Sequence, residues 1–255
     1  MKRREYPILE CDSSREAIIE PGKVVNPIDI AERCVICFYP DVINDVMKKG
    51  GAKQVSTLTS AIGRHPIYEM DFKGNRLAFF HPSMGAPLAA VVLEEVIALG
   101  CRKFIACGSA GVLTKDIAVG HIVVPVSAVR DEGTSYHYLP PTREVQASPE
   151  AVSAIEQVLK RYSIPYILGK TWTTDAFYRE TPGKVKLRCE EGCLTVEMEA
   201  AALFAVARFR QVLLGQILCG GDDVSGEEWD ARRGVERASF REKVFWLAAE
   251  ACLEL

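Results

Sequence analysis

The stretch that decides how this chain is interpreted is Glu197-Met198-Glu199-Ala200-Ala201-Ala202, in which two acids precede a run of small residues. A later apolar run ends in Gly220-Gly221-Asp222-Asp223. Small residues allow a backbone to approach a ligand closely, and carboxylates accept hydrogen bonds from hydroxyl groups. One acid cluster is suited to holding neighbouring hydroxyls, as on a ribose, and the other to passing a proton to a leaving group. Together they indicate a site for glycosyl transfer.

Around these two clusters, short apolar runs alternate with amphipathic or apolar segments of helical length. This alternation predicts the α/β class. No linker, repeat or low-complexity tract interrupts it, so we expect a single domain over residues 1–255. The expected strands are 34–38, 103–107, 121–129, 166–173 and 212–219, with strands and turns over 54–80, and the expected helices are 40–49, 87–99, 149–162, 198–208 and 238–253.

Composition excludes several classes of protein. The 255 residues are 48% hydrophobic and 25% charged, with a net charge of −3 that gives no electrostatic basis for binding nucleic acid. The sequence shows neither a membrane-spanning apolar stretch nor an apolar segment after the basic start that would mark a secretory signal. Nine cysteines, an odd number, do not suggest a disulfide framework. We therefore expect a cytoplasmic protein with reduced thiols.

Cysteine pairs and histidines give no metal site. Cys34 and Cys37 are three apart on an expected strand, so their side chains point to opposite faces. Cys189 and Cys193 are four apart on an expected helix without a third ligand, which indicates packing residues. The four histidines are scattered without metal-ligand spacing.

Gly108-Ser109-Ala110-Gly111 follows an expected strand and has some features of a dinucleotide-binding loop. The first glycine of that fingerprint is missing, and the residues after Gly111 predict another strand where a pyrophosphate-binding helix would have to begin. Two interpretations stay open for this loop: a nest of backbone amides for one anion, or a tight turn.

Five motifs occur in one order along the chain. They are Met84-Gly85-Ala86-Pro87, Gly108-Ser109-Ala110-Gly111, Val129-Arg130-Asp131-Glu132-Gly133-Thr134-Ser135, Thr174-Asp175-Ala176-Phe177-Tyr178 and Val196-Glu197-Met198-Glu199-Ala200-Ala201. In this order they resemble the nucleoside phosphorylase family, which includes purine nucleoside phosphorylase, uridine phosphorylase and related nucleosidases. The resemblance runs from about Val35 to the C-terminus, and its most specific motif is the last.

The resemblance implies a three-layer α/β/α sandwich around a mixed, partly barrel-like central sheet. It also implies a pentosyltransferase that uses phosphate to cleave the N-glycosidic bond of a purine or uridine nucleoside, giving free base and ribose 1-phosphate. Phosphate is then the co-substrate, and no cofactor is needed. The implied assembly is a homo-oligomer, either a dimer or a hexamer of dimers, in which Arg64 reaches the phosphate site of the neighbouring subunit.

The resemblance assigns Asp222 as the acid that protonates the departing base and Glu199 as the group that holds both ribose hydroxyls. An acid working near neutral pH must carry a proton, so we expect burial to raise the pKa of Asp222. The other implied substrate contacts are Met198, Glu197, Gly108, Ser109, Ala110, Phe177, Tyr178 and Arg179, and the implied phosphate contacts are Arg64 and Ser109.

The chain departs from the family where the phosphate would bind. The family's Pro-Gly-Asp-Pro loop and following arginine are replaced by Phe38-Tyr39-Pro40-Asp41-Val42-Ile43, and a second arginine position is Ala106. Each lost charged hydrogen bond weakens phosphate binding by about 1.5–3 kcal/mol. Three interpretations stay open: phosphorolysis, hydrolysis with water positioned by Asp41, and nucleoside binding without catalysis. The base is also open, because Asp222 favours a purine while residues 131–138 resemble uridine phosphorylases.

Overall fold

A computed structural model describes residues 3–233 and 238–255. The helices are α1 (Pro21–Val24), α2 (Pro40–Lys49), α3 (Ala86–Leu99), α4 (Pro149–Arg161), α5 (Pro182–Glu190), α6 (Ala200–Arg210) and α7 (Ala238–Leu253), with the 3-10 helices η1 (Pro7–Leu9), η2 (Thr134–His137) and η3 (Phe177–Arg179). The strands are β1 (Arg33–Cys37), β2 (Ala52–Ser60), β3 (Gly63–Phe72), β4 (Asn75–Phe80), β5 (Lys103–Val112), β6 (Ile122–Asp131), β7 (Glu144–Gln146), β8 (Tyr166–Thr174), β9 (Cys193–Glu197) and β10 (Leu213–Asp223).

All the strands belong to one mixed sheet, in the order β10-β6-β8-β9-β5-β1-β4-β3-β2, with β7 beside β6. Strand β10 also pairs with β5, so β10, β6, β8, β9 and β5 form a closed ring. The parallel core of β4, β1, β5 and β10 sends its carboxyl ends to one edge. This confirms the predicted mixed, partly barrel-like sheet.

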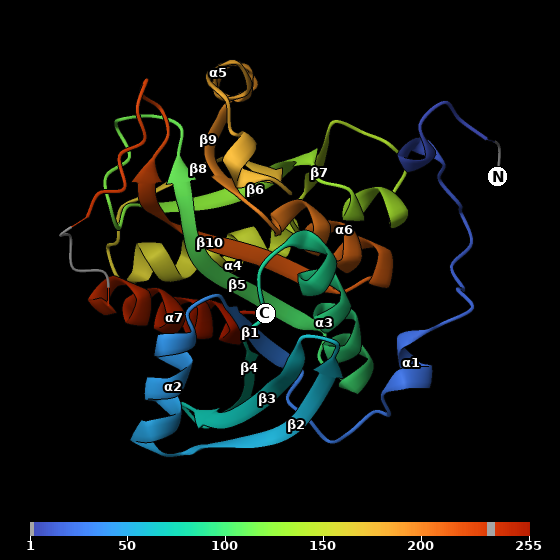
Figure 1. Ribbon diagram of the computed structural model, residues 1–255. Helices are drawn as coiled ribbons and strands as arrows, with labels where there is room; N and C mark the ends of the chain where they lie inside the picture. Colours follow the sequence, from blue (N-terminus) through green and yellow to red (C-terminus); the bar gives the residue numbers. More distant parts are fainter. Residues whose placement is uncertain (1–2, 234–237) are drawn as a thin grey trace.

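The two faces of the sheet carry separate hydrophobic clusters. Alternate residues of β1 divide between them: Cys34 and Ile36 pack with α3 and α6, while Val35 and Cys37 pack with α2, α4 and α7. Figure 1 shows α2 and α7 on one side of the sheet and α3 and α6 on the other. The predicted α/β/α layering is therefore confirmed, as is the opposite orientation of Cys34 and Cys37. All nine cysteines are free thiols.

Strand β5 is longer than its sequence predicts. Gly108–Gly111 was expected to form a loop or turn, but these residues continue the strand to Val112. The reason is tertiary: here β5 pairs with β10 on one side, Ala110 opposite Gly220, and with β9 on the other, Gly111 opposite Val196. Small residues fit this crowded position, since a Cβ on Gly111 would lie 3.0 Å from the Val196 side chain.

Two other expectations near the site are wrong. Cys189 and Cys193 do not share a helix, because α5 ends at Glu190 and Cys193 begins β9. The helix expected from Met198 begins only at Ala200. Strand β9, which pairs with β5 and β8, ends at Glu197, and Met198 and Glu199 form a bend between the strand and the helix.

Helix α6 is buried on all sides from Ala200 to Ala207. Its alanines allow close packing against α3, and both helices belong to one hydrophobic cluster. Among the described helices none combines the length and apolar character needed to cross a bilayer.

Gly220 tests the tight packing at the end of β10. A Cβ at this position would lie 2.5 Å from the Ala118 carbonyl oxygen and 2.9 Å from Ile117 Cγ2. We expect Gly220→Ala to lower the free energy of unfolding by about 1–3 kcal/mol, because a backbone carbonyl cannot move aside as a side chain can. Urea denaturation measures the change.

Gly183→Ala in α5 is the control, because apart from its chain neighbours and the backbone of its own helix no atom lies within 4 Å of the added Cβ. Alanine favours helix over glycine, so this variant should not lose stability. Equal stability of Gly220→Ala and the unsubstituted chain would contradict the packing argument.

Candidate functional site

A cavity of about 630 Å³ opens beside the carboxyl ends of β1, β4 and β5. In open α/β sheets this edge is the usual place for a ligand. The cavity brings together Gly108, Ser109, Glu197, Met198, Glu199 and Asp41, all predicted from the sequence. Its lining is completed by Phe38, Tyr39, Pro40, His81, Ser83, Met84, Gln216 and Arg241.

Glu197, the last residue of β9, caps the following helix. Its Oε2 accepts hydrogen bonds from the backbone N–H groups of Glu199 (2.7 Å) and Ala200 (2.6 Å). The Thr173 hydroxyl donates to its Oε1 at 2.6 Å and accepts from Ala201 N. A carboxylate at a helix N-terminus satisfies free N–H groups and complements the helix dipole. Glu197 thus fixes the turn that points Glu199 at the cavity.

Glu199 lines the cavity and is only 6% exposed. Its Oε1 accepts a hydrogen bond from Gly85 N at 2.6 Å. Gly85, just before α3, has φ +94°, a backbone conformation that residues with a side chain rarely adopt. The Met84-Gly85 motif therefore has a physical basis: glycine makes the turn whose N–H orients the acid.

The two glutamates form a buried pair of like charges. Burial, and then the charge of Glu199, raise the pKa of Glu197 above its ordinary value against three opposing hydrogen bonds. Burial likewise raises the pKa of Glu199. At neutral pH the pair therefore favours holding a proton between its carboxyls.

Ser109 and Tyr39 meet at another part of the cavity wall. The Tyr39 hydroxyl lies 3.1 Å from Ser109 Oγ, in a hydrogen bond that either group can donate. Gly108 lies behind Phe38, whose ring carbon would be 3.2 Å from an added Cβ. Ala110, predicted as a contact, is buried and outside the lining.

Asp222 lies next to this cavity and outside its lining. It is half-buried at the end of β10, where the exposed Trp229 donates its indole N–H to Asp222 Oδ2 at 2.7 Å. A Cβ on the preceding Gly221 would lie 3.8 Å from the Cβ of Ser109, a cavity residue. Asp222 and Glu199 therefore lie on opposite sides of the end of β5, on β10 and just after β9.

The predicted base-side residues Phe177, Tyr178 and Arg179 form η3 and are exposed outside the lining. The two aromatic rings lie 3.9 Å apart between centroids. The next residue, Glu180, is electrostatically coupled to Asp222: burial, together with the charge of Asp222, raises the pKa of Glu180 to about 7. This places η3 on the Asp222 side of the site.

Arg64 does not reach the cavity of its own chain. It is exposed near the β2–β3 turn, opposite Thr59 in the register. Asp41 does line the cavity, from the first turn of α2, and its Oδ2 accepts from Arg241 Nη1 at 3.1 Å.

Comparison with known proteins decides the family. The sequence model of the phosphorylase superfamily matches residues 32–251. This chain belongs to the phosphorylase superfamily. A guanosine phosphorylase of Halorubrum lacusprofundi is 32% identical over 198 residues, covering 72% of this chain and 80% of that protein. A uridine phosphorylase of Treponema pallidum is 29% identical over 202 residues, covering 74% and 72%.

Solved structures show the same fold. Uridine phosphorylase of Vibrio fischeri superposes with a TM-score of 0.76 at 23% identity, covering 91% of this chain and 95% of that one. Purine nucleoside phosphorylase of Toxoplasma gondii, in complex with immucillin-H, gives 0.75 at 21% identity, covering 89% and 92%. The resemblance inferred from the five motifs is thus confirmed, and the superfamily fold surrounds the cavity.

Several residues that line the cavity of this superfamily member were not predicted from the sequence. Arg241 belongs to α7, 200 residues after its partner Asp41, and no local pattern marks it. Gln216 lies on β10 opposite Ala106, and its buried Oε1 has no hydrogen-bond partner among the described residues. A polar residue within the apolar run that forms β10 was the available signal for Gln216.

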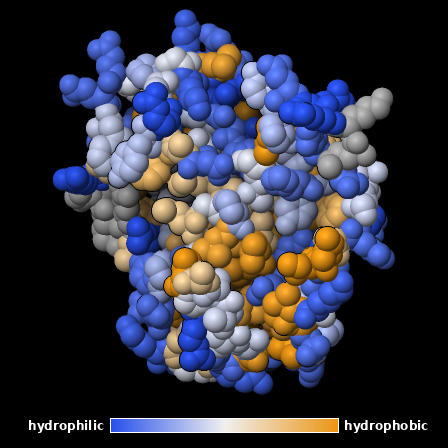
Figure 2. Space-filling model, turned by 45° about the vertical axis from the view of Figure 1, so that its right-hand side comes forward, coloured by the Kyte–Doolittle hydropathy of each residue, from blue (hydrophilic) through white to orange (hydrophobic). Residues whose placement is uncertain are grey.

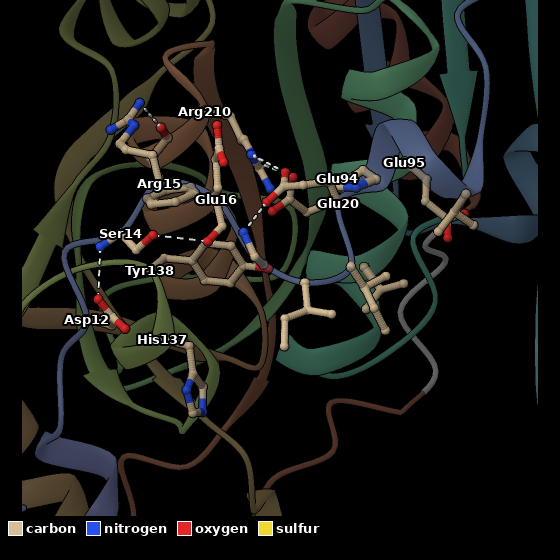
Figure 3. Close-up of a pocket in the computed structure, with 17 residues that line it drawn as sticks. Asp12, Ser14, Arg15, Glu16, Glu20, Glu94, Glu95, His137, Tyr138 and Arg210 are labelled. Atoms are coloured by element: carbon tan, nitrogen blue, oxygen red, sulfur yellow. Dashed lines mark hydrogen bonds and ion pairs between the residues drawn. The ribbon is translucent and has the colours of Figure 1, made fainter. Parts of the chain in front are cut away.

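A second hollow, of about 590 Å³, lies between the N-terminal segment and the helices α3 and α6. Figure 3 shows Arg210 between Glu20 and Glu94, and its nitrogens lie 3.1 Å and 2.6 Å from their carboxylates. Arg15 donates to the Phe209 carbonyl oxygen at 2.8 Å. These contacts fasten the N-terminal segment to the body of this phosphorylase superfamily member. None of the predicted site residues lines this hollow.

The buried glutamate pair predicts a pH dependence of stability. A carboxyl whose pKa is higher in the folded than in the unfolded chain binds its proton more tightly when folded. Stability should therefore fall as pH rises from the ordinary value of 4.5 through about 7 to 8. Glu199→Gln should reduce this fall by about 1–3 kcal/mol, since each pKa unit corresponds to about 1.4 kcal/mol.

Thermal unfolding at pH 5, 6, 7 and 8 measures the effect. Glu228→Gln, at an exposed position, is the control and should keep the original slope. An identical slope in Glu199→Gln and the unsubstituted chain would show that the buried pair does not set the pH dependence.

Proposed function

We propose that this chain is a nucleoside phosphorylase that splits the N-glycosidic bond with phosphate, giving free base and ribose 1-phosphate. The observation that carries the proposal is the convergence of Glu199, Met198 and Ser109 in one cavity, with Asp222 beside it. Relatives named guanosine phosphorylase and uridine phosphorylase support the reaction class. We place the reaction in the cytoplasm, and with phosphate as co-substrate it needs no cofactor.

The chemistry requires stabilisation at two points. As the glycosidic bond breaks, positive charge develops on the sugar ring and negative charge on the departing base. Glu199 accepts hydrogen bonds from the ribose hydroxyls and fixes the sugar over Met198. A phosphate oxygen attacks C1′ from the face opposite the base. The bonding electrons leave with the base, which takes a proton from Asp222.

Glu180 is a second carboxyl group close to Asp222. Burial, together with the charge of Asp222, raises the pKa of Glu180 to about 7, so Glu180 itself can retain a proton near neutral pH. Trp229 N–H holds one oxygen of Asp222, which orients the carboxyl. An acid that can address a ring nitrogen favours a purine, and we propose a purine nucleoside as the preferred substrate.

The first test follows base release from purine nucleosides and uridine, with and without phosphate, and identifies the sugar product. We expect release to require phosphate and to yield ribose 1-phosphate.

Asp222→Asn should lower kcat about 100-fold or more while changing the nucleoside KM little, because proton donation acts in the transition state. Glu227→Gln, in the exposed segment that follows, is the control.

Each other outcome identifies a different protein. Free ribose formed equally well without phosphate would identify a nucleosidase, with Asp41 in the cavity positioning water. Micromolar nucleoside binding without cleavage would identify a binding protein. Full activity of Asp222→Asn on every substrate would remove Asp222 from the acid role.

We also propose a homo-oligomer, a dimer or a hexamer of dimers, in which Arg64 serves the neighbouring subunit. Arg64 is exposed near Ile62, whose side chain is 70% exposed. Met84, just before α3, and Val91, within α3, are also exposed apolar residues. Figure 2, which brings the α1 side of Figure 1 forward, shows apolar side chains gathered on this face. Such a patch is typical of a protein–protein contact.

Mixing two inactive chains tests the shared arginine. In a two-fold dimer of Arg64→Ala with Glu199→Gln, one site of each hybrid recovers both residues, so a random mixture should regain about one quarter of the original activity. Activity that stays at the level of the separate variants would place Arg64 outside the neighbour's site. Size-exclusion chromatography with light scattering checks the assembly of each variant.

A further inference from the structure

The cavity contains three carboxyl groups, those of Asp41, Glu197 and Glu199. Arg241 is the one arginine or lysine among the described residues that line it. A phosphate dianion needs cationic or N–H partners to replace its hydration. An oxyanion that enters this cavity therefore finds one full positive charge in the described lining, that of Arg241.

Arg241 is held at the wall where hydroxyl groups also gather. Its guanidinium carbon lies 5.4 Å above the centre of the Tyr39 ring, and the Tyr39 hydroxyl is bonded to Ser109 Oγ. The Nε of Arg241 is buried and finds no acceptor among the described residues. The guanidinium therefore retains donor capacity beside the Tyr39–Ser109 pair.

The present partner of Arg241 is easily exchanged. The side chains of Arg241 and Asp41 are 35% and 45% exposed, and ion pairs as exposed as this one contribute little to stability. A phosphate dianion carries more charge than the carboxylate and accepts two parallel N–H bonds from a guanidinium.

We propose that Arg241 binds the phosphate co-substrate, and that Asp41 holds the guanidinium until the anion displaces it. The inference rests on the proposed phosphorylase function. It assigns to α7 a cation that the Phe38–Ile43 segment and Ala106 do not supply. Asp41 then limits phosphate affinity instead of positioning water.

Steady-state kinetics with phosphate as the varied substrate test the proposal. Arg241→Ala should raise the phosphate KM about tenfold or more and leave the nucleoside KM within about twofold, because the lost bonds are charge-assisted. Arg241→Lys should give an intermediate phosphate KM, because a lysine keeps the charge and loses the bidentate fork. Asp41→Asn should lower the phosphate KM, since Arg241 loses its competing partner.

Lys243→Ala is the matched control, because it removes one positive charge from an exposed position of the same helix. Its phosphate KM should not change. A phosphate KM unaffected by Arg241→Ala, or raised equally by Lys243→Ala, would overturn the assignment. A phosphate KM raised by Asp41→Asn would overturn the exchange.

A binding measurement separates this inference from the proposed reaction. Inorganic phosphate should raise the melting temperature of the unsubstituted chain and of Lys243→Ala, and have less effect on Arg241→Ala. If no nucleoside is cleaved but this pattern holds, the reaction fails and the anion site stands. If nucleosides are cleaved with phosphate but the shift is the same in all variants, the reaction stands and the Arg241 site fails.

Discussion

The double pairing of strand β5 is the constraint on which the rest of the structure depends. Near Gly111, β5 bonds to β9 on one side and to β10 on the other, and this closes the ring of strands. The closure carries two acids to either side of one strand end: Glu199, just after β9, and Asp222, at the end of β10. A side chain at Gly111 would meet the Val196 side chain at 3.0 Å, so a small residue fits best between these elements.

The site also contains an arrangement of buried acids that is unfavourable for the stability of the fold. Two glutamates and a helix N-terminus occupy one buried volume, and burial alone disfavours a second ionised carboxylate. Glu197 offsets part of this cost by accepting hydrogen bonds from the backbone N–H groups of Glu199 and Ala200 at the start of α6. Glu199 accepts a hydrogen bond from the backbone N–H of Gly85 and lines the cavity. One acid thus stabilises the turn, and the other is left for a ligand.

The opposite end of the cavity holds the groups that we propose for binding phosphate. The sheet and helices match those of solved phosphorylases at 23% and 21% identity, so the framework tolerates wide substitution. Around Tyr39 and Asp41 the polar groups come from the start of α2, with Arg241 reaching them from α7. In the proposed phosphorylase, the fold that it shares with these structures positions the sugar site, and local side chains determine how phosphate is held.

The sequence by itself determined the alternation of strands and helices, the opposite faces of Cys34 and Cys37, and the placement of Glu199 near the start of a helix. These features depend on side-chain periodicity and on residues close in the chain. Only the tertiary structure decided that Gly108–Gly111 continues β5, that Trp229 binds Asp222, and that Arg241 meets Asp41. Each of these features depends on partners that the closed sheet brings together. Arg241 and Asp41, for example, are 200 positions apart in the sequence, and no local pattern encodes their contact.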